Sequence, residues 1–180
     1  TADLFNLDQI NLIPEPVAAL IGYNAVHPQA PLKGDILIID IGGGTTDFSF
    51  INTSHDIYQV TIESQFQIGH DAFSGSEVDR GILHHILLPA YQMQTGQTLP
   101  SAFLKEKNLP SREQYLWNQM MQYAEKLKIE LSNSEETYIN IPDFFNGNSL
   151  QIALTSSLFL DRLQLVYSRL ETYFNECVKP

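Results

Sequence analysis

The chain has 180 residues and a formal net charge of −11, from 10 basic and 21 acidic side chains. Nucleic acid and anionic membrane surfaces both attract basic faces, so neither is expected as a partner. Hydrophobic residues make up 43% and charged residues 17%, which indicates a folded chain and excludes a disordered one. The longest apolar runs are far shorter than the ~20 residues of a membrane span.

The single cysteine and the first residue bear on the compartment and the extent of the protein. Cys177 cannot form an internal disulfide and offers no set of zinc ligands, which fits a reducing cytoplasm. The five histidines lack the spacing of metal ligands. The chain starts at Thr1 rather than Met and no signal peptide follows, so we expect a piece of a longer protein.

The first 40 residues predict a strand, a helix and a second strand. An apolar run at 10–13 is followed by two prolines, and Pro16 is a suitable first residue for a helix. The next apolar run, Ile36–Ile39, is continuous, which is typical of a strand buried on both faces. This strand is expected to end at Asp40.

A run of three glycines at 42–44 then predicts a tight turn. From Thr46 to Ile51 apolar and polar residues alternate, so the turn should connect the strands of a β-hairpin. Another alternating stretch at 58–62 predicts a third antiparallel strand.

Two capping boxes predict helices in the second half of the chain. Ser74 with Glu77 begins a helix that Pro89 should end or kink. Ser111 with Gln114 begins another helix, after a long polar connection. The second helix should carry one broad apolar stripe of Tyr115, Leu116, Met120, Ala124, Leu127 and Leu131. Its aromatic residues should pack in the core or between helices: Tyr115, Trp117 and Tyr123.

This helix is expected to end near Ser132 and to be followed by a second hairpin. Strands at 137–141 and 150–154 flank Asn146-Gly147, a favoured pair for a tight β-turn. Residues 155–157 should cap a final amphipathic helix that carries Leu158, Leu163, Val166, Leu170 and Phe174.

The segment Asp40-Ile41-Gly42-Gly43-Gly44-Thr45-Thr46-Asp47 has the features of a phosphate site. Glycines lack Cβ atoms, so consecutive N–H groups can turn toward one anion that approaches closely. Asp40 and Asp47 are suited to hold the waters around Mg²⁺, and the Thr45 hydroxyl can donate to a phosphate. A P-loop and a Rossmann turn are excluded, because each needs a helix after its glycines. An ordinary glycine-rich hairpin is the alternative, although it has no use for a carboxylate at each end.

Pro14-Glu15-Pro16-Val17-Ala18-Ala19-Leu20 together with residues 38–47 resembles the second-lobe signature of the actin, sugar-kinase and 70-kDa heat-shock superfamily. Residues 73–79, 124–132 and 137–159 make the chain most similar to the DnaK-type heat-shock chaperones. The resemblance implies an α/β fold, namely a ribonuclease H-like (actin-like ATPase) lobe with a smaller inserted α/β subdomain. Residues 1–71 and 151–180 would form the lobe, which resembles subdomain IIA, and residues 72–150 the insert, which resembles subdomain IIB.

The resemblance assigns roles around the glycine turn. Glu15 would lie near the metal and the attacking water, and Asp40 and Thr45 would complete the catalytic set. Asp40 and Asp47 would hold Mg²⁺ through water. The second phosphate loop would consist of Gly42, Gly43, Gly44 and Thr45.

The resemblance also places nucleotide contacts on the helix that contains residues 124–132. Glu125 and Lys128 match residues that contact the ribose side, and Ser132 matches one that reaches the adenine. At Ile129 the family usually has an arginine that stacks on the adenine, so the contact with the base is expected to differ. From the residues alone, Glu125 and Lys128 fit a solvated helix face equally well.

The implied function is the second lobe of the ATP-binding domain of a 70-kDa heat-shock-type molecular chaperone. The parent protein would bind ATP or ADP with Mg²⁺ and hydrolyse ATP to drive a cycle on unfolded client polypeptides, with co-chaperones as further partners. The resemblance places the first lobe upstream, so the 180 residues alone are expected to be inactive. Two alternatives are an MreB-like bacterial actin and a catalytically degenerate nucleotide-sensing or scaffold protein, the latter favoured by Ile129.

Overall fold

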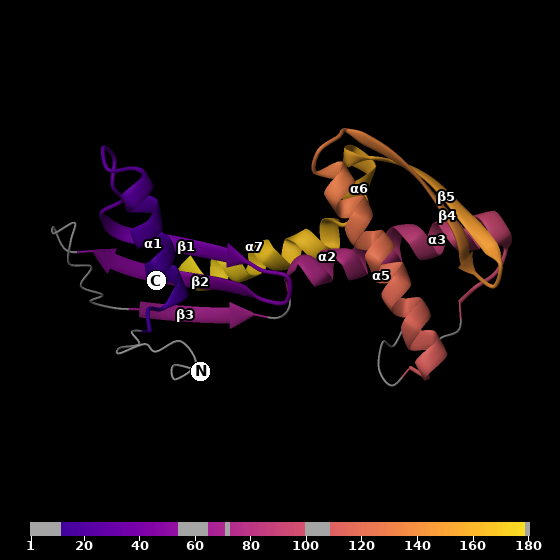
Figure 1. The fold of residues 1–180 in the computed structure, drawn as a ribbon, viewed down its shortest axis with the longest axis horizontal. Helices are drawn as coiled ribbons and strands as arrows, with labels where there is room; N and C mark the ends of the chain where they lie inside the picture. Colours follow the sequence, from indigo (N-terminus) through magenta and orange to yellow (C-terminus); the bar gives the residue numbers. More distant parts are fainter. Residues whose placement is uncertain (1–11, 54–64, 71–72, 100–108, 179–180) are drawn as a thin grey trace, which may run out of the picture. The chain divides into compact units, whose positions relative to one another are not determined.

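The computed structural model describes residues 12–53, 65–70, 73–99 and 109–178, and Figure 1 shows its helices and strands. The described chain contains both helices and strands, which is consistent with the predicted α/β class. None of the described helices has both the length and the apolarity that crossing a membrane requires.

The chain divides into two compact units. The first unit consists of Thr1–Asp40 and Asp47–Gly69, and the second of Ile41–Thr46 and His70–Pro180. These units reflect packing within the 180 residues. The predicted lobe and insert, with boundaries near 72 and 150, stay a prediction.

The first unit contains one helix and most of a three-stranded sheet. The helix α1 spans Glu15–Val26, and the strands β1, β2 and β3 span Gly34–Ile41, Thr46–Thr53 and Gln65–His70. The strands pair in the order β1-β2-β3, and their arrows alternate in direction in Figure 1. The predicted first hairpin is therefore present. The strand predicted at 58–62 lies outside the described residues, and β3 was not predicted.

Helix α1 begins one residue before its predicted start. Pro14 precedes it, and Pro16 lies in its first turn, where a missing N–H removes no helical hydrogen bond. Of the apolar run predicted as a preceding strand, 10–13, the first two residues lie outside the described part. The other two, Leu12 and Ile13, are not in a strand.

The core of the first unit is small. Val17 and Leu20 on α1 and Ile51 on β2 are buried, and Ile36 and Ile38 of β1 pack against them. Alternate residues of a strand point to the same face, so Ile36 and Ile38 mark the face of β1 that α1 covers.

The prediction that β1 is buried on both faces was wrong for this chain. Ile39 is 45% exposed and Ile41 is 50% exposed. Both belong to the other face of β1, and β1 is an edge strand of the three-stranded sheet. The apolar run favours a β-strand, but it does not indicate whether another element covers each face of that strand.

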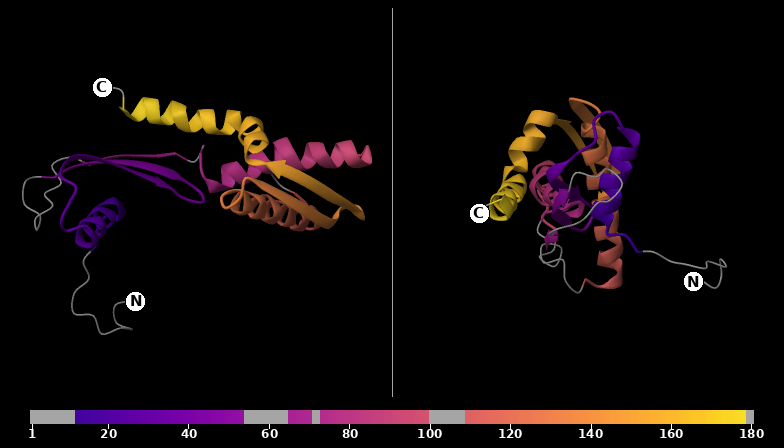
Figure 2. Two further views of the ribbon diagram at one scale, coloured as in Figure 1. Left: turned by 90° about the horizontal axis from the view of Figure 1, so that it is seen from above. Right: turned by 90° about the vertical axis from the view of Figure 1, so that its left-hand side faces the viewer.

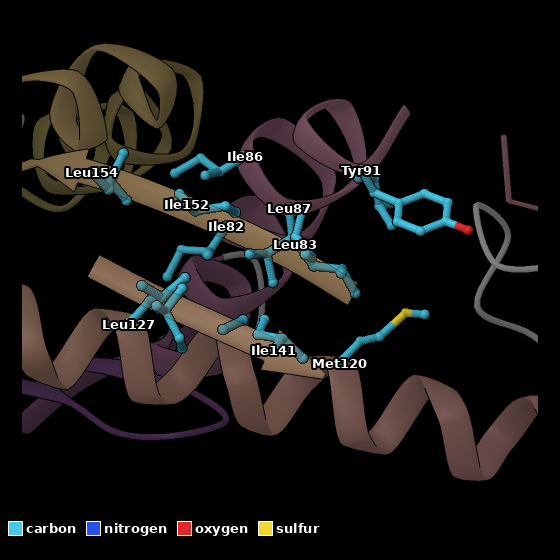
Figure 3. Packing of buried hydrophobic residues seen from close by; sticks show 14 of the residues in the cluster. Ile82, Leu83, Ile86, Leu87, Tyr91, Met120, Leu127, Ile141, Ile152 and Leu154 are labelled. Atoms are coloured by element: carbon cyan, nitrogen blue, oxygen red, sulfur yellow. The ribbon is translucent and has the colours of Figure 1, made fainter. Parts of the chain in front are cut away.

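The second unit surrounds one continuous core. Its elements are α2 (Gly75–Ile82), the π-helical turn η2 (Leu83–Leu87), α3 (Leu88–Thr95), α5 (Ser111–Leu131), β4 (Glu136–Phe145), β5 (Asn148–Thr155), α6 (Ser156–Arg162) and α7 (Gln164–Val178). In Figure 3, side chains from the α2 to α3 stretch, from α5 and from the β4-β5 hairpin point toward one another. Three of them, Ile82, Leu127 and Ile141, are completely buried.

Pro89 does not end its helix, contrary to one of the two predicted outcomes. The helical stretch continues through α3 to Thr95, and Gly96 ends it with a positive φ of 71°. Just before the proline, the Leu88 N–H bonds the Leu83 carbonyl in a wider π-type turn. This turn accommodates Pro89, whose missing N–H cannot maintain the regular α-helical ladder.

Helix α5 differs from its prediction at its beginning but not at its end. Ser111 is its first residue rather than its cap, and Pro110 precedes it without a side-chain cap. The predicted end near Ser132 is confirmed, because Ser132 follows the last residue of α5. Tyr115 is 62% exposed, so the stripe does not include it, whereas Trp117 is buried as expected.

The predicted second hairpin is confirmed. Ile139 pairs with Ile152 across the antiparallel strands, and the turn residues Asn146 and Gly147 have φ angles of 51° and 78°. Asparagine and glycine tolerate these positive φ values, which the turn requires. The Asp143 carboxylate also accepts a hydrogen bond from the Gly147 N–H at 2.8 Å.

The final helix was predicted as one element but is two. The Thr155 hydroxyl accepts the Leu158 N–H, so the predicted cap is confirmed. Helix α6 then ends at Arg162, and the next residue, Leu163, has non-helical dihedrals of −101° and 8°. Figure 2 shows the change of direction between α6 and α7. Leu163 is completely buried, and the chain turns around this anchored side chain.

Candidate functional site

The glycine turn between β1 and β2 is held to the start of α2. The Gly42 N–H bonds the Thr45 carbonyl at 2.8 Å and closes the turn. The carbonyl of Gly42 accepts the N–H of Gly75, and the carbonyl of Gly43 accepts the N–H of Ser76, each at 2.9 Å. The Ser76 hydroxyl also donates to the Gly43 carbonyl, at 2.6 Å. The turn and the first residues of α2 therefore form one hydrogen-bonded assembly.

These bonds orient the peptide groups of the turn. In a trans peptide the N–H points opposite to the carbonyl, and the described chain has no cis peptide. The carbonyls of Gly42 and Gly43 point at α2, so the N–H groups of Gly43 and Gly44 point away from it. Neither of these two N–H groups donates a hydrogen bond to any described residue. The turn thus presents two neighbouring donors on its outer side.

The glycines of the turn are not required by its dihedral angles. None of Gly42, Gly43 and Gly44 has a positive φ. A Cβ added at Gly43 or Gly44 would meet no atom within 4 Å, and one at Gly42 would lie 3.2 Å from the Thr45 carbonyl oxygen. What glycine provides at 43 and 44 is therefore bare backbone, which allows a ligand to approach the two N–H groups closely.

Three predicted carboxylates line one cavity of about 320 Å³ in the first unit. Glu15 comes from the first turn of α1, Asp40 from the end of β1, and Asp47 from the beginning of β2. Glu15 and Asp40 are exposed, and Asp47 is half-buried. The complete lining is Glu15, Pro16, Ala19, Ile38, Ile39, Asp40, Asp47 and Ser49.

The carboxylates suit a hydrated cation better than one bound directly. Within the described ranges, no three His, Cys, Asp or Glu side chains are arranged to hold a metal ion. Mg²⁺ commonly keeps several of its waters and is held by few carboxylates. Glu15, Asp40 and Asp47 around a shared space fit such a cation with its water shell.

A second cavity, of about 480 Å³, lies entirely within the second unit. Two predicted nucleotide residues of α5, Lys128 and Ser132, line it beside Gly75. The other lining side chains are largely apolar, among them Ile41, Phe73, Val78, Phe159 and Leu170. The predicted residues Glu125 and Ile129 do not line this cavity, and Ile129 is 54% exposed on α5.

Lys128 is bound by a carboxylate that the sequence analysis did not identify. Its ammonium nitrogen lies 2.8 and 2.9 Å from the two carboxylate oxygens of Asp79 and donates to the Gly75 carbonyl at 3.3 Å. Asp79 is buried on α2, and burial raises the pKa of its carboxyl, while the hydrogen bond and charge of Lys128 lower it in part and the charge of Glu125 raises it. The sequence could have identified Asp79, because this aspartate lies between Val78 and Ile82 on the apolar face of a predicted helix.

Ser49 is the other polar residue that sequence reasoning missed. It lines the carboxylate cavity, yet it is only 1% exposed. Its position two residues after Asp47 on a predicted strand was the available signal, because residues i and i+2 share a face.

The chain is similar to known proteins over nearly its whole length. The family model described as "Hsp70 protein" matches residues 2–179. A "Heat shock 70 kDa protein, mitochondrial" from Solanum tuberosum is 28% identical over 177 residues, which cover 96% of this chain and 23% of the relative. A "Chaperone protein DnaK" from Deinococcus proteolyticus is 30% identical over 143 residues, which cover 78% of this chain and 19% of the relative.

A "Heat shock protein 70 homolog" of Acanthamoeba polyphaga mimivirus is 26% identical over 182 residues and matches 100% of this chain but 17% of its own length. The chain therefore spans about a fifth of the length of these relatives, between 17% and 23%. Since the family model covers almost every residue, the chain belongs to the Hsp70 protein family.

Proposed function

We propose that this chain supplies the phosphate and magnesium side of an ATP site in an Hsp70-type chaperone. The observation that carries the proposal is the orientation of the glycine turn, whose Gly43 and Gly44 N–H groups point outward together. Two adjacent N–H groups on bare backbone are suited to bind the oxygens of a phosphate. The remaining members of the second phosphate loop would be Gly42 and Thr45.

The carboxylate cavity supplies the metal side of the same proposal. Asp40 and Asp47 would hold Mg²⁺ through its waters, and Glu15 would accept hydrogen bonds from the attacking water. Bound Mg²⁺ would neutralise the negative charge that develops on the phosphates during transfer. These roles use the carboxylates as hydrogen-bond acceptors for water, which fits side chains that are exposed or half-buried.

Lys128 and Ser132 would bind the nucleoside. Both line the largely apolar cavity of the second unit, where an aromatic base and a ribose find apolar walls and a few polar groups. Glu125 and Ile129 would contribute from the exposed face of the same helix, with an apolar contact from Ile129 in place of a stacked arginine.

The finer fold and the partners are part of the proposal. We place the chain in a ribonuclease H-like lobe with an inserted subdomain at 72–150. In the complete protein, ATP hydrolysis would drive a cycle on unfolded polypeptides, with co-chaperones, in the cytoplasm. The reducing setting that a single cysteine suits supports this compartment.

An assay of ATP hydrolysis by the complete protein tests the function. We expect turnover that an unfolded peptide stimulates, and Asp40→Asn should lower it about 100-fold by weakening the hold on the hydrated metal. Asp161→Asn, an exposed carboxylate on α6 outside both cavities, is the matched control and should leave turnover unchanged. The 180 residues alone should show no turnover.

Unchanged turnover in Asp40→Asn would refute the metal role of this carboxylate. A second candidate function is nucleotide sensing without hydrolysis, favoured by Ile129 at the position where the family usually has arginine. Binding of ATP by the complete protein without any turnover would support that candidate against the first.

A further inference from the structure

Ser49 has a buried hydroxyl that pairs with no group in the described part of the chain. The side chain is 1% exposed, and its oxygen makes no hydrogen bond with any described residue. A polar group buried without a partner loses its hydrogen bonds to water and destabilises the fold. An alanine at this position would avoid that cost, so the hydroxyl calls for an explanation.

The position of Ser49 on β2 explains where its hydroxyl lies. Asp47, Ser49, Ile51 and Thr53 alternate onto one face of the strand. Ile51 packs beneath α1, while Asp47 and Ser49 line the cavity that also contains Glu15 and Asp40. Ser49 is therefore the most buried of the polar residues that line the carboxylate cavity.

We propose that Ser49 is a positioning residue for the hydrated cation of this cavity. Its oxygen would accept a hydrogen bond from a water in the Mg²⁺ shell. The waters around Mg²⁺ are strong donors and need acceptors on several sides. Three carboxylates provide charged acceptors, and Ser49 adds an uncharged one on the same face of β2 as Asp47. This inference rests on the proposed function.

The proposal predicts that stability and metal binding respond differently to loss of the hydroxyl. Thr53 provides the matched control, because it lies on the same face of β2 and its hydroxyl accepts the Gly34 N–H at 2.8 Å. Thr53 lies outside the carboxylate cavity. Ser49→Ala removes a hydroxyl that has no hydrogen-bond partner among the described residues, whereas Thr53→Ala removes one that is hydrogen-bonded.

The experiment measures Mn²⁺ binding to the complete protein with ADP, from the paramagnetic resonance signal of free Mn²⁺. We expect Ser49→Ala to weaken Mn²⁺ binding about tenfold, as loss of a group that orients metal ligands does. Its thermal midpoint without nucleotide should be unchanged or higher. Thr53→Ala should lower the thermal midpoint and leave Mn²⁺ binding unchanged, and Asp40→Asn should weaken Mn²⁺ binding.

The outcomes separate this inference from the proposed function. If Asp40→Asn weakens Mn²⁺ binding and Ser49→Ala does not, the role of Ser49 is refuted while the proposed site stands. If Ser49→Ala lowers the nucleotide-free thermal midpoint as much as Thr53→Ala does, the hydroxyl is structural and the inference is also refuted. If the unmodified protein takes up no Mn²⁺ with ADP, the proposed function fails, and the role of Ser49 with it.

Discussion

The two units of the chain differ in how they use their interiors. In the second unit, apolar side chains from helices and a hairpin enclose one another, as around Leu127 and Ile141. In the first unit, α1 covers a few apolar residues, and the neighbouring interior space is lined by Glu15, Asp47 and the buried Ser49. A large part of the stabilising burial therefore lies in the second unit, whereas the first unit leaves polar groups available around a cavity.

The largest expected effect on stability comes from truncating two buried leucines on helices, one in each unit. Leu127 on α5 lies within the large core, and Leu20 on α1 lies within the small one, at 0% and 2% exposure. Leu127→Ala should lower the free energy of unfolding by about 4 kcal/mol, because its neighbours enclose the cavity that remains. Leu20→Ala should cost about 2 kcal/mol, since a thin layer can collapse onto the gap. Denaturant titration measures both, and equal losses would remove the contrast between the units.

The next effect tests the ion pair of the second unit and depends on pH. Lys128→Met should lower the free energy of unfolding by about 3 kcal/mol at pH 7, because it leaves the buried Asp79 carboxylate unpaired. Without Lys128, the pKa of Asp79 rises further, since Lys128 supplies the interactions that lower it.

The direction in which stability changes with pH follows from the raised pKa of Asp79. The folded variant holds the Asp79 proton more tightly than the unfolded chain, so its stability is highest below the ordinary pKa of 3.8 and falls as pH rises through the folded value. The deficit of Lys128→Met relative to the unmodified protein should therefore be smaller at pH 4 than at pH 7. Thermal unfolding at a series of pH values checks this, and a constant deficit would contradict the pairing.

The smallest effect compares two helical glycines. In α1, a Cβ at Gly22 would meet no atom within 4 Å, so Gly22→Ala should stabilise the protein by about 0.8 kcal/mol through helix propensity. In the second unit, a Cβ at Gly81 would lie 2.8 Å from Val166 and 2.9 Å from Leu163, and Gly81→Ala should cost about 1 kcal/mol net. Thermal midpoints measure both changes, and a midpoint that rises in Gly81→Ala would contradict the tight packing around Gly81.

Features set by local chemistry were predictable from the sequence. The Ser74 hydroxyl caps α2, the Thr155 hydroxyl caps α6, and Asn146-Gly147 forms the tight turn of the second hairpin. Each needs only residues a few positions apart. Glu15, Asp40 and Asp47 also line one cavity, whereas the roles that the resemblance implied for them stay a prediction.

Features set by distant partners were not predictable. The exposure of Tyr115 and Ile39 depends on which elements cover them, and the π-type turn before Pro89 depends on how a whole helix packs. Asp79 and Ser49 were missed for the same reason. The role of Asp79 depends on Lys128, which is 49 residues away in the sequence. The position of Ser49 matters because of a cavity built by three separate segments.

The hydrogen bonds between the glycine turn and α2 change the polarisation of the peptide groups in the turn. A peptide group whose carbonyl accepts a hydrogen bond becomes polarised, and its own N–H becomes a stronger donor. The carbonyls of Gly42 and Gly43 accept from the first N–H groups of α2, where the helix dipole is positive. The N–H groups of these same peptide units are those of Gly43 and Gly44. Helix α2 therefore makes the Gly43 and Gly44 N–H groups stronger hydrogen-bond donors, although it contacts only the opposite side of the turn. These are the two donors that an anion would meet first.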